Sequence, residues 1–222
     1  MPQNAWTLSY QDVMGLCRLA YVNRSDAGGI YMLAGREWRV STIYNAGPFR
    51  AILAEGKDLQ NNNTRVLSFS GSDIEWGDWN HRGNFGNAMM GADNTEQYQV
   101  GLNLARQVRP TYYTGHSLGG GIALYSCVNT SIRAATINPS PLFNDVFGTQ
   151  YNKYNNTPWA INYCVNYEML AAGRNTAAVG AFGFAAGATP GTRVTVGSLS
   201  KDPYNRHLLA NLEGFSEPVK KN

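Results

Sequence analysis

Two spacings of apolar residues alternate along the chain and predict helices and strands in turn. From Tyr10 to Tyr21 apolar side chains recur at helical spacing, which predicts a helix with a broad apolar face. Glycines break residues 30–55 into three short β-prone runs, IYMLA, EWRVSTIYN and FRAILAE, which predict short strands. Residues 64–71, TRVLSFSG, have the pattern of a buried strand that ends in a turn. The first third of the chain therefore predicts one helix followed by four strands.

The rest of the chain alternates helices with strands. Residues 95–108 predict a helix that stops before Pro110. Strands are predicted in TYYTG, IRAATIN, WAINYCVN and RVTVGSL, with a helix rich in small residues after the first of them. This alternation predicts an α/β fold, with a mixed and mostly parallel central sheet and helices on both faces. The N-terminal strands would extend that sheet in an antiparallel sense. With no internal repeat and no polar linker, residues 1–222 are predicted to form a single domain.

The composition is that of a globular protein and excludes several classes of function. The chain is 43% hydrophobic and 12% aromatic, which argues against disorder. Its net charge of +3 is mild, and beyond Lys220 and Lys221 no basic block stands out, so no nucleic-acid partner is expected. Residues 177–190 are apolar but short and rich in glycine, so no transmembrane span is expected. The first residues lack the pattern of a signal peptide, which predicts a soluble protein that would need a leaderless route for export.

The cysteines do not suggest a metal site. Cys17, Cys127 and Cys164 are odd in number and stand in apolar surroundings, which predicts buried thiols; one disulfide stays open if the protein meets an oxidising compartment. No cluster of histidine, cysteine and aspartate has the spacing of metal ligands. We therefore expect neither a metal nor a cofactor.

A single serine stands between glycines where a predicted strand gives way to a predicted helix. The stretch GHSLGGG places Ser117 midway between Gly115 and Gly119. Serine is a weak nucleophile until a base takes its proton, and a tight strand-to-helix turn can present it to such a base. The helix N-terminus also directs backbone N–H groups and a partial positive charge toward this point. The pattern predicts Ser117 as a nucleophile, and an inert serine in a glycine-rich turn is the alternative.

The same stretch resembles the nucleophile elbow of the class 3 (fungal-type) lipases, which usually reads GHSLGG. A second resemblance to that family lies in VLSFSGSDIEWGDW, residues 66–79, where Ser70 replaces the family's arginine and Gly71 and Ser72 match. The resemblance implies an α/β-hydrolase fold. It also implies an oxyanion hole formed by Ser72 and by the backbone N–H of Leu118, whose donors stabilise the negative charge of the transition state.

Three histidines are candidates for the base. His116 adjoins the serine and is interpreted as a residue that packs or hydrogen-bonds locally, while His81 suits an exposed loop. His207 lies near the C-terminus, and the order serine, acid, histidine is the one that the α/β-hydrolase fold uses. His207 is therefore the predicted base, with His81 as the alternative.

The acid of the triad is expected between Ser117 and His207. Glu168 follows a buried-looking strand, at the point where a class 3 lipase has its acid, although the family usually has aspartate there. Asp145 and Asp202 are the alternatives. Glu168 is the predicted acid, since glutamate serves in some α/β hydrolases.

The family resemblance implies a serine ester hydrolase that acts on lipids, either a lipase or a phospholipase A. Residues 74–91 carry tryptophan, phenylalanine and methionine among glycines, which suits a lid that meets lipid; packing on the sheet is the alternative. The expected partners are a lipid or phospholipid substrate and, transiently, a membrane surface. By analogy with bacterial lipase effectors, a cognate inhibitor protein is a further expected partner. Another serine hydrolase or acyltransferase, or a binding domain with a degenerate triad, stays open.

Overall fold

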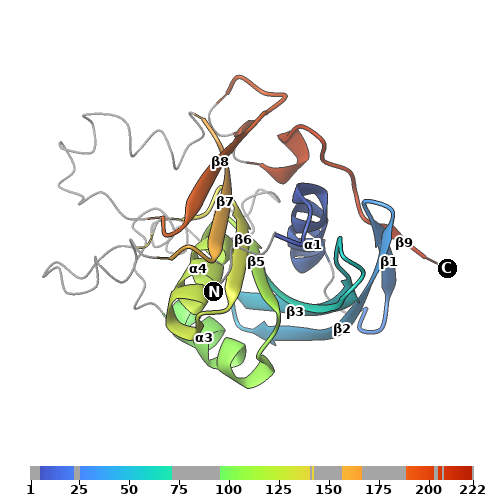
Figure 1. The fold of residues 1–222 in the computed structure, drawn as a ribbon, viewed down its shortest axis with the longest axis vertical. Helices are drawn as coiled ribbons and strands as arrows, with labels where there is room; N and C mark the ends of the chain where they lie inside the picture. Colours follow the sequence, from blue (N-terminus) through green and yellow to red (C-terminus); the bar gives the residue numbers. More distant parts are fainter. Residues whose placement is uncertain are drawn as a thin grey trace, which may run out of the picture.

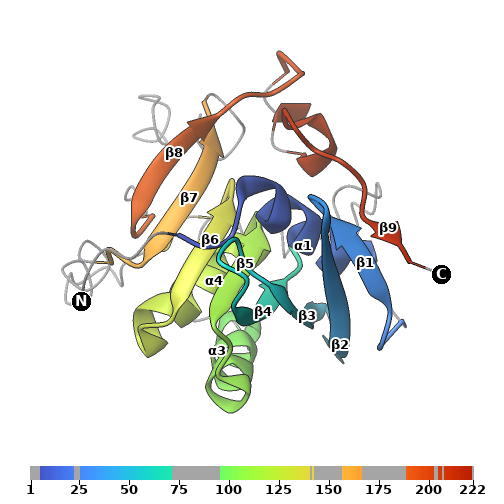
Figure 2. The ribbon, with the colours of Figure 1, turned by 45° about the vertical axis from the view of Figure 1, so that its right-hand side comes forward.

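The computed structural model describes residues 6–22, 26–71, 96–140, 142, 157–166, 189–202, 205–206 and 208–221. Within these residues, nine strands form one sheet in the order β8-β7-β6-β5-β4-β3-β2-β1-β9, with helices packed on both faces (Figures 1 and 2). The helical elements are α1 (Tyr10–Val22), α3 (Glu96–Val108), α4 (Leu118–Thr130) and the 3₁₀ turn η3 (Leu209–Asn211). The strands are β1 (Ile30–Leu33), β2 (Arg36–Ala46), β3 (Phe49–Lys57), β4 (Asn63–Phe69), β5 (Tyr112–His116), β6 (Arg133–Ile137), β7 (Ala160–Val165), β8 (Thr192–Val196) and β9 (Val219–Lys220).

The sheet is mixed, as the sequence predicted. Strands β4 to β8 pair in parallel, each with the next along the chain. Strands β1, β2 and β3 extend the sheet in an antiparallel sense, and β9 pairs antiparallel with β1 at the far edge (Figure 2). In the part of the chain that the structure describes, parallel and antiparallel pairings are equal in number, so the prediction of a mostly parallel sheet was wrong. The predicted α/β class is confirmed, whereas β9 was not predicted.

The two faces of the sheet bury separate sets of side chains, because successive residues of a strand point to opposite faces. Val66 of β4 and Tyr112 of β5 belong to the apolar cluster that contains α1. Their neighbours Leu67 and Tyr113 belong to the cluster that contains α3 and α4. The helices therefore cover both faces, as predicted, and the central strands carry hydrophobic residues on each side.

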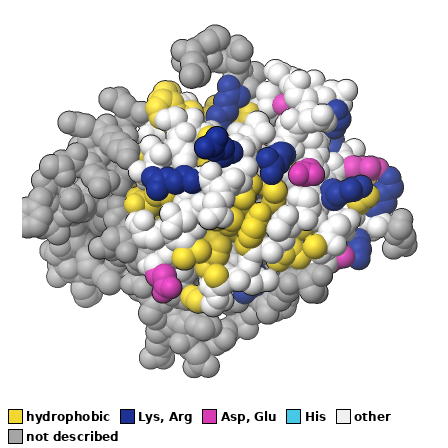
Figure 3. All heavy atoms as spheres, turned by 90° about the horizontal axis from the view of Figure 1, so that it is seen from below, with side chains coloured by type: hydrophobic (Ala, Val, Ile, Leu, Met, Phe, Trp, Pro, Cys, Tyr) yellow, Lys and Arg dark blue, Asp and Glu magenta, His cyan; other side chains and the backbone are white. Residues whose placement is uncertain are grey.

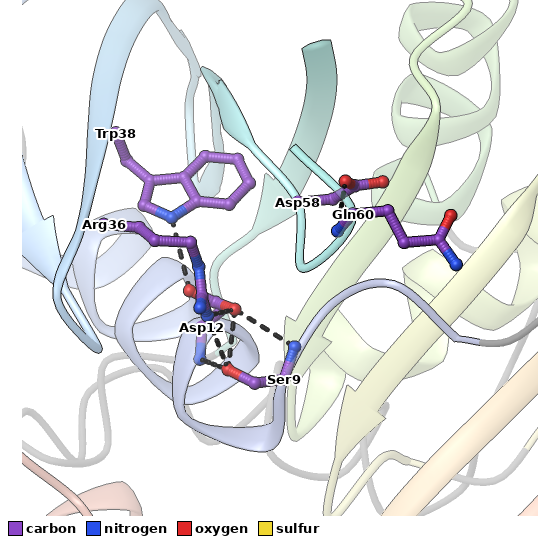
Figure 4. Close-up of polar contacts among 6 residues, drawn as sticks. All are labelled: Ser9, Asp12, Arg36, Trp38, Asp58 and Gln60. Carbon is purple, nitrogen blue, oxygen red and sulfur yellow. Dashed lines mark hydrogen bonds and ion pairs between the residues drawn. The ribbon is translucent and has the colours of Figure 1, made fainter. Parts of the chain in front are cut away.

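A buried carboxylate attaches the start of α1 to the antiparallel half of the sheet (Figure 4). The backbone N–H of Ser9 donates to Asp12 Oδ2 (3.0 Å) and the N–H of Asp12 donates to Ser9 Oγ (3.1 Å), which forms a capping box. Arg36 of β2 forms an ion pair with Asp12, and Trp38 Nε1 donates to Asp12 Oδ1 (3.3 Å). Asp12 is fully buried, so these partners take the place of water around its carboxylate.

The predicted burial of the cysteines is confirmed. Cys17, Cys127 and Cys164 are all buried free thiols. Burial raises the pKa of the Cys17 and Cys127 thiols, so both stay protonated at neutral pH. Among the described residues, no group of three or more His, Cys, Asp or Glu side chains gathers in a way that would hold a metal ion.

The surface shows where apolar and charged side chains gather. Seen from below, it carries a band of hydrophobic side chains with Lys and Arg along one side (Figure 3). A hollow of about 510 Å³ on the antiparallel strands is lined by charged residues such as Arg39, Lys57 and Arg65. Ser117 does not line this hollow. Among the described residues, no helix has the length and apolar character needed to cross a membrane.

Candidate functional site

Ser117 stands at the sharp turn between β5 and α4, where the sequence predicted it. Its backbone has φ 56° and ψ −126°, a combination that residues other than glycine rarely adopt. Its N–H donates to the carbonyl oxygen of Ile137 (3.2 Å), and its carbonyl oxygen accepts from the N–H groups of Gly121 (3.1 Å) and Ser140 (2.9 Å). Such a conformation costs about 1–3 kcal/mol and persists only where the surroundings impose it. Strain at a strand-to-helix turn is typical of a nucleophile elbow.

Glycines allow three backbone segments to meet at this turn. A Cβ atom on Gly115 would overlap the carbonyl group of Gly119, and a Cβ atom on Gly119 would overlap the carbonyl oxygen of Phe69 at the end of β4. A Cβ atom on Gly120 would lie 2.8 Å from the Cβ atom of Pro139. Glycines on both sides of the serine therefore allow the close approach of strand and helix.

The end of β4 lies directly against the turn. A Cβ atom on Gly71 would overlap the hydroxyl group of Tyr21 and lie 3.2 Å from the Cβ atom of Ser117. The N–H of Ser70 donates to the carbonyl oxygen of Arg50 on β3 (3.0 Å), and Nη1 of Arg50 donates to the carbonyl oxygen of Tyr21 (3.1 Å). Arg50 therefore contacts Ser70 through its main chain and the end of α1 through its side chain.

His116 faces α1 rather than the outer side of the turn. Its Nδ1 lies 2.8 Å from the hydroxyl oxygen of Tyr21, and its side chain is buried. The two rings are tilted, with centroids 5.8 Å apart. This geometry agrees with the interpretation of His116 as a residue that packs and hydrogen-bonds locally.

The segment just before His207 reaches the same end of the sheet as Ser117. Nδ2 of Asn138 donates to the carbonyl oxygen of Arg206 (3.4 Å). Asn138 directly follows Ile137, whose carbonyl oxygen accepts the N–H of Ser117. Ser117 and Arg206 thus form hydrogen bonds with two consecutive residues at the end of β6. Sequence reasoning missed both Asn138 and Arg206, and the one sequence signal for Arg206 was its position next to a predicted base.

Several predicted site residues lie outside the described part of the chain. They are Ser72, His81, Asp145, Glu168 and His207, together with the predicted lid at residues 74–91. Leu118 is described: it is the first residue of α4, where helix N–H groups have no partner within the helix. Asp202 is exposed, and its Oδ1 accepts the N–H of Asn205 (2.9 Å). Within the described residues, the carboxylate of Asp202 thus caps a short turn.

Comparison with family models assigns the protein to a class. The chain belongs to the phospholipase-like proteins. The matching model is that of the Tle-like phospholipase domain, over residues 28–209, which span β1 to β8 and include Ser117. A comparison with curated proteins gave no match. The family indicates an enzyme that hydrolyses lipids, as the sequence predicted, whereas the finer resemblance to class 3 lipases stays a prediction.

Proposed function

We propose that the protein is a serine phospholipase of the α/β-hydrolase fold, with Ser117 as its nucleophile. The observation that carries this proposal is the strained backbone of Ser117 at the turn between β5 and α4. Membership of the phospholipase-like family supports a lipid ester as the substrate. No cofactor enters the proposed reaction, because the nucleophile, the base and the acid are all side chains of the protein.

The proposed reaction proceeds through an acyl-enzyme. The hydroxyl oxygen of Ser117 attacks the ester carbonyl carbon while His207 accepts the hydroxyl proton, and Glu168 orients the imidazole and stabilises its charged form. Donors from Ser72 and the N–H of Leu118 stabilise the oxyanion. His207 then gives its proton to the departing alcohol. Water hydrolyses the acyl-enzyme by the same steps, which releases the fatty acid and restores the serine.

The described neighbours of the proposed base and acid support this assignment. Arg206 precedes His207, and its carbonyl oxygen accepts a hydrogen bond from Asn138. Asn138 follows Ile137, whose carbonyl oxygen accepts the N–H of Ser117. Glu168 follows shortly after β7, and β7 lies beside β6 in the sheet. Asn166 and Arg206, the described residues that come before Glu168 and His207 in the sequence, are therefore attached to strand ends near the turn. In an open α/β sheet, active sites form at the carboxyl ends of the parallel strands.

The proposal extends to the setting of the enzyme. We propose one domain over residues 1–222, a transient contact with a membrane surface during catalysis, and delivery as a secreted effector. A toxin of this kind would be matched by a cognate inhibitor protein. Affinity purification from lysates of cells that produce the enzyme, with the tagged enzyme as bait, tests this part. Failure to recover a specifically bound inhibitor protein would count against it.

A fluorophosphonate probe tests the nucleophile. Such probes bond covalently to an activated serine, so the wild type should be labelled in a 1:1 ratio and Ser117→Ala should not be labelled. Ser126→Ala is a matched control, because Ser126 is a buried serine in the middle of α4 and has no proposed role. Equal labelling of wild type and Ser117→Ala would overturn the proposal, and so would absence of labelling in both.

A further inference from the structure

The side chain of Arg206 fastens the C-terminal segment to the sheet. Its Nε donates to the carbonyl oxygen of Ser200 (3.0 Å), and its Nη1 donates to the carbonyl oxygen of Asn166 (3.0 Å). The N–H of Arg206 also donates to the carbonyl oxygen of Asp202 (2.9 Å). One guanidinium group therefore links Arg206 to Ser200 and ties both to Asn166, the residue that follows β7.

Asn138 holds the main chain of the same segment from the other side. Asn138 is buried, and its φ of 40° lies in the left-handed region. Its Oδ1 accepts the N–H of Val165 (2.9 Å), and its own N–H donates to the carbonyl oxygen of Tyr163 (2.9 Å). Because these bonds fix the amide group, its Nδ2 meets the carbonyl oxygen of Arg206 from a fixed position. Arg206 is thus held by β6 through its main chain and by the end of β7 through its side chain.

We propose that Arg206 is a positioning residue for the base of the reaction. This inference rests on the proposed function, in which His207, the next residue, is that base. A displacement of about 1 Å in a reacting group can reduce the rate about 100-fold, so the backbone that carries the base must be fixed. Arginine suits this task because its planar guanidinium group donates in two directions at once, whereas lysine presents a single point charge. Arg206 itself contacts main-chain oxygens and takes no part in the chemistry.

Steady-state hydrolysis of a soluble short-chain phosphatidylcholine tests the inference in four proteins: the wild type, Arg206→Ala, Arg206→Lys and Arg193→Ala. Arg193→Ala is the matched control, because Nη2 of Arg193 donates to Oδ1 of the same Asn166 (3.2 Å) but comes from β8 rather than from the 200–206 segment. Titration with the fluorophosphonate probe counts the active serines, so kcat refers to folded enzyme. Arg206→Ala should lower kcat at least 10-fold, with KM within about threefold of wild type. The kcat of Arg206→Lys should lie between those of the wild type and Arg206→Ala, and the kcat of Arg193→Ala should match that of the wild type.

The outcomes separate this inference from the proposed function. A wild-type kcat in Arg206→Ala, or equal losses in Arg206→Ala and Arg193→Ala, would overturn the positioning role. If Arg206→Ala does not fold, Arg206→Lys decides: a lowered kcat supports the role and an unchanged kcat overturns it. Labelling of Ser117→Ala at the wild-type rate would instead overturn the proposed function itself, whatever the Arg206 variants do.

Discussion

At the scale of single residues, Ser117 is held in a backbone conformation that its own side chain disfavours. Neighbouring segments impose this conformation. The end of β4 packs closely against Gly119, and hydrogen bonds with Ile137 and Ser140 hold the peptide groups of Ser117. A protein that needed only a turn here would place glycine at residue 117. Retention of serine in a position that costs about 1–3 kcal/mol is therefore an argument for function.

This strain has a measurable consequence. Glycine tolerates a positive φ without a steric penalty, whereas alanine does not. Ser117→Gly should be more stable than Ser117→Ala by about 1 kcal/mol in urea-induced unfolding, although the probe should label neither. Equal free energies of unfolding in the two variants would show that the turn imposes no strain on this residue.

The proposed acid is tested at the same scale by two isosteric changes. Glu168→Gln should lose most of its activity while the protein stays folded, because a neutral amide cannot stabilise an imidazolium ion. Asp202→Asn should keep near-normal turnover, since the carboxylate of Asp202 is occupied with the N–H of Asn205. Phospholipid turnover and circular dichroism of both variants measure this. Normal turnover in Glu168→Gln would move the acid to Asp145 or Asp202.

At the scale of elements, one ion pair fixes α1 against the antiparallel strands. Removal of one partner of a buried pair typically destabilises a protein by about 3–5 kcal/mol, because the other charge is left without compensation. Asp12→Ala should therefore lower the free energy of unfolding by about 3 kcal/mol. The double variant Asp12→Leu with Arg36→Met should lose less than the two single changes added together. Strict additivity in this double-mutant cycle would contradict a direct interaction.

The turn between β3 and β4 gives the fold a sensitivity to acid. Asp58 accepts the N–H group of Gln60 (2.9 Å; Figure 4). It also accepts the N–H group of Asn62 (2.9 Å). Burial raises the pKa of Asp58, but the hydrogen bonds from Asn62, Thr7 and Gln60 outweigh it and hold the pKa below its ordinary value. A lowered folded-state pKa stabilises the protein above the unfolded-state pKa, and this stabilisation is lost as the pH falls through the folded-state value.

The corresponding measurement is urea-induced unfolding of wild type and Asp58→Asn between pH 7 and pH 2. The wild type should be the more stable protein at neutral pH, and the difference should shrink below about pH 4, where the carboxyl group of the unfolded chain becomes protonated. A difference that stays constant over this range would show that the ionised carboxylate contributes nothing.

At the scale of the whole molecule, the sequence predicted the strands and helices because each one carries a local pattern of apolar residues. The buried-strand pattern in residues 64–71 and the helical spacing in residues 10–21 are local patterns, and both elements formed as expected. Strand β9 was missed because two residues show no period. Its attachment depends on distant partners, such as the pairing of Val219 with Met32 on β1 and the ion pair of Lys220 with Asp26 (2.9 Å).

The candidate site, too, was predicted only where its residues lie close together in the sequence. GHSLGGG predicted the turn at Ser117 because a strand, a glycine spacing and a helix start all lie within one short stretch. The contacts of Asn138 with Arg206 and of Tyr21 with His116 join residues 68 and 95 positions apart, so no local pattern reveals them. The assignments of Ser72, Glu168 and His207 stay predictions.

The central claim is that Ser117 hydrolyses phospholipid esters. Mass spectrometry of defined phospholipid vesicles after incubation with wild type and with Ser117→Ala tests this claim most directly, since it identifies the lipid consumed and the position cleaved. Wild type should release free fatty acid and lysophospholipid in equal amounts, and Ser117→Ala should leave the vesicles unchanged. Release of the same products by Ser117→Ala, or no release by the wild type from any phospholipid class, would contradict the account.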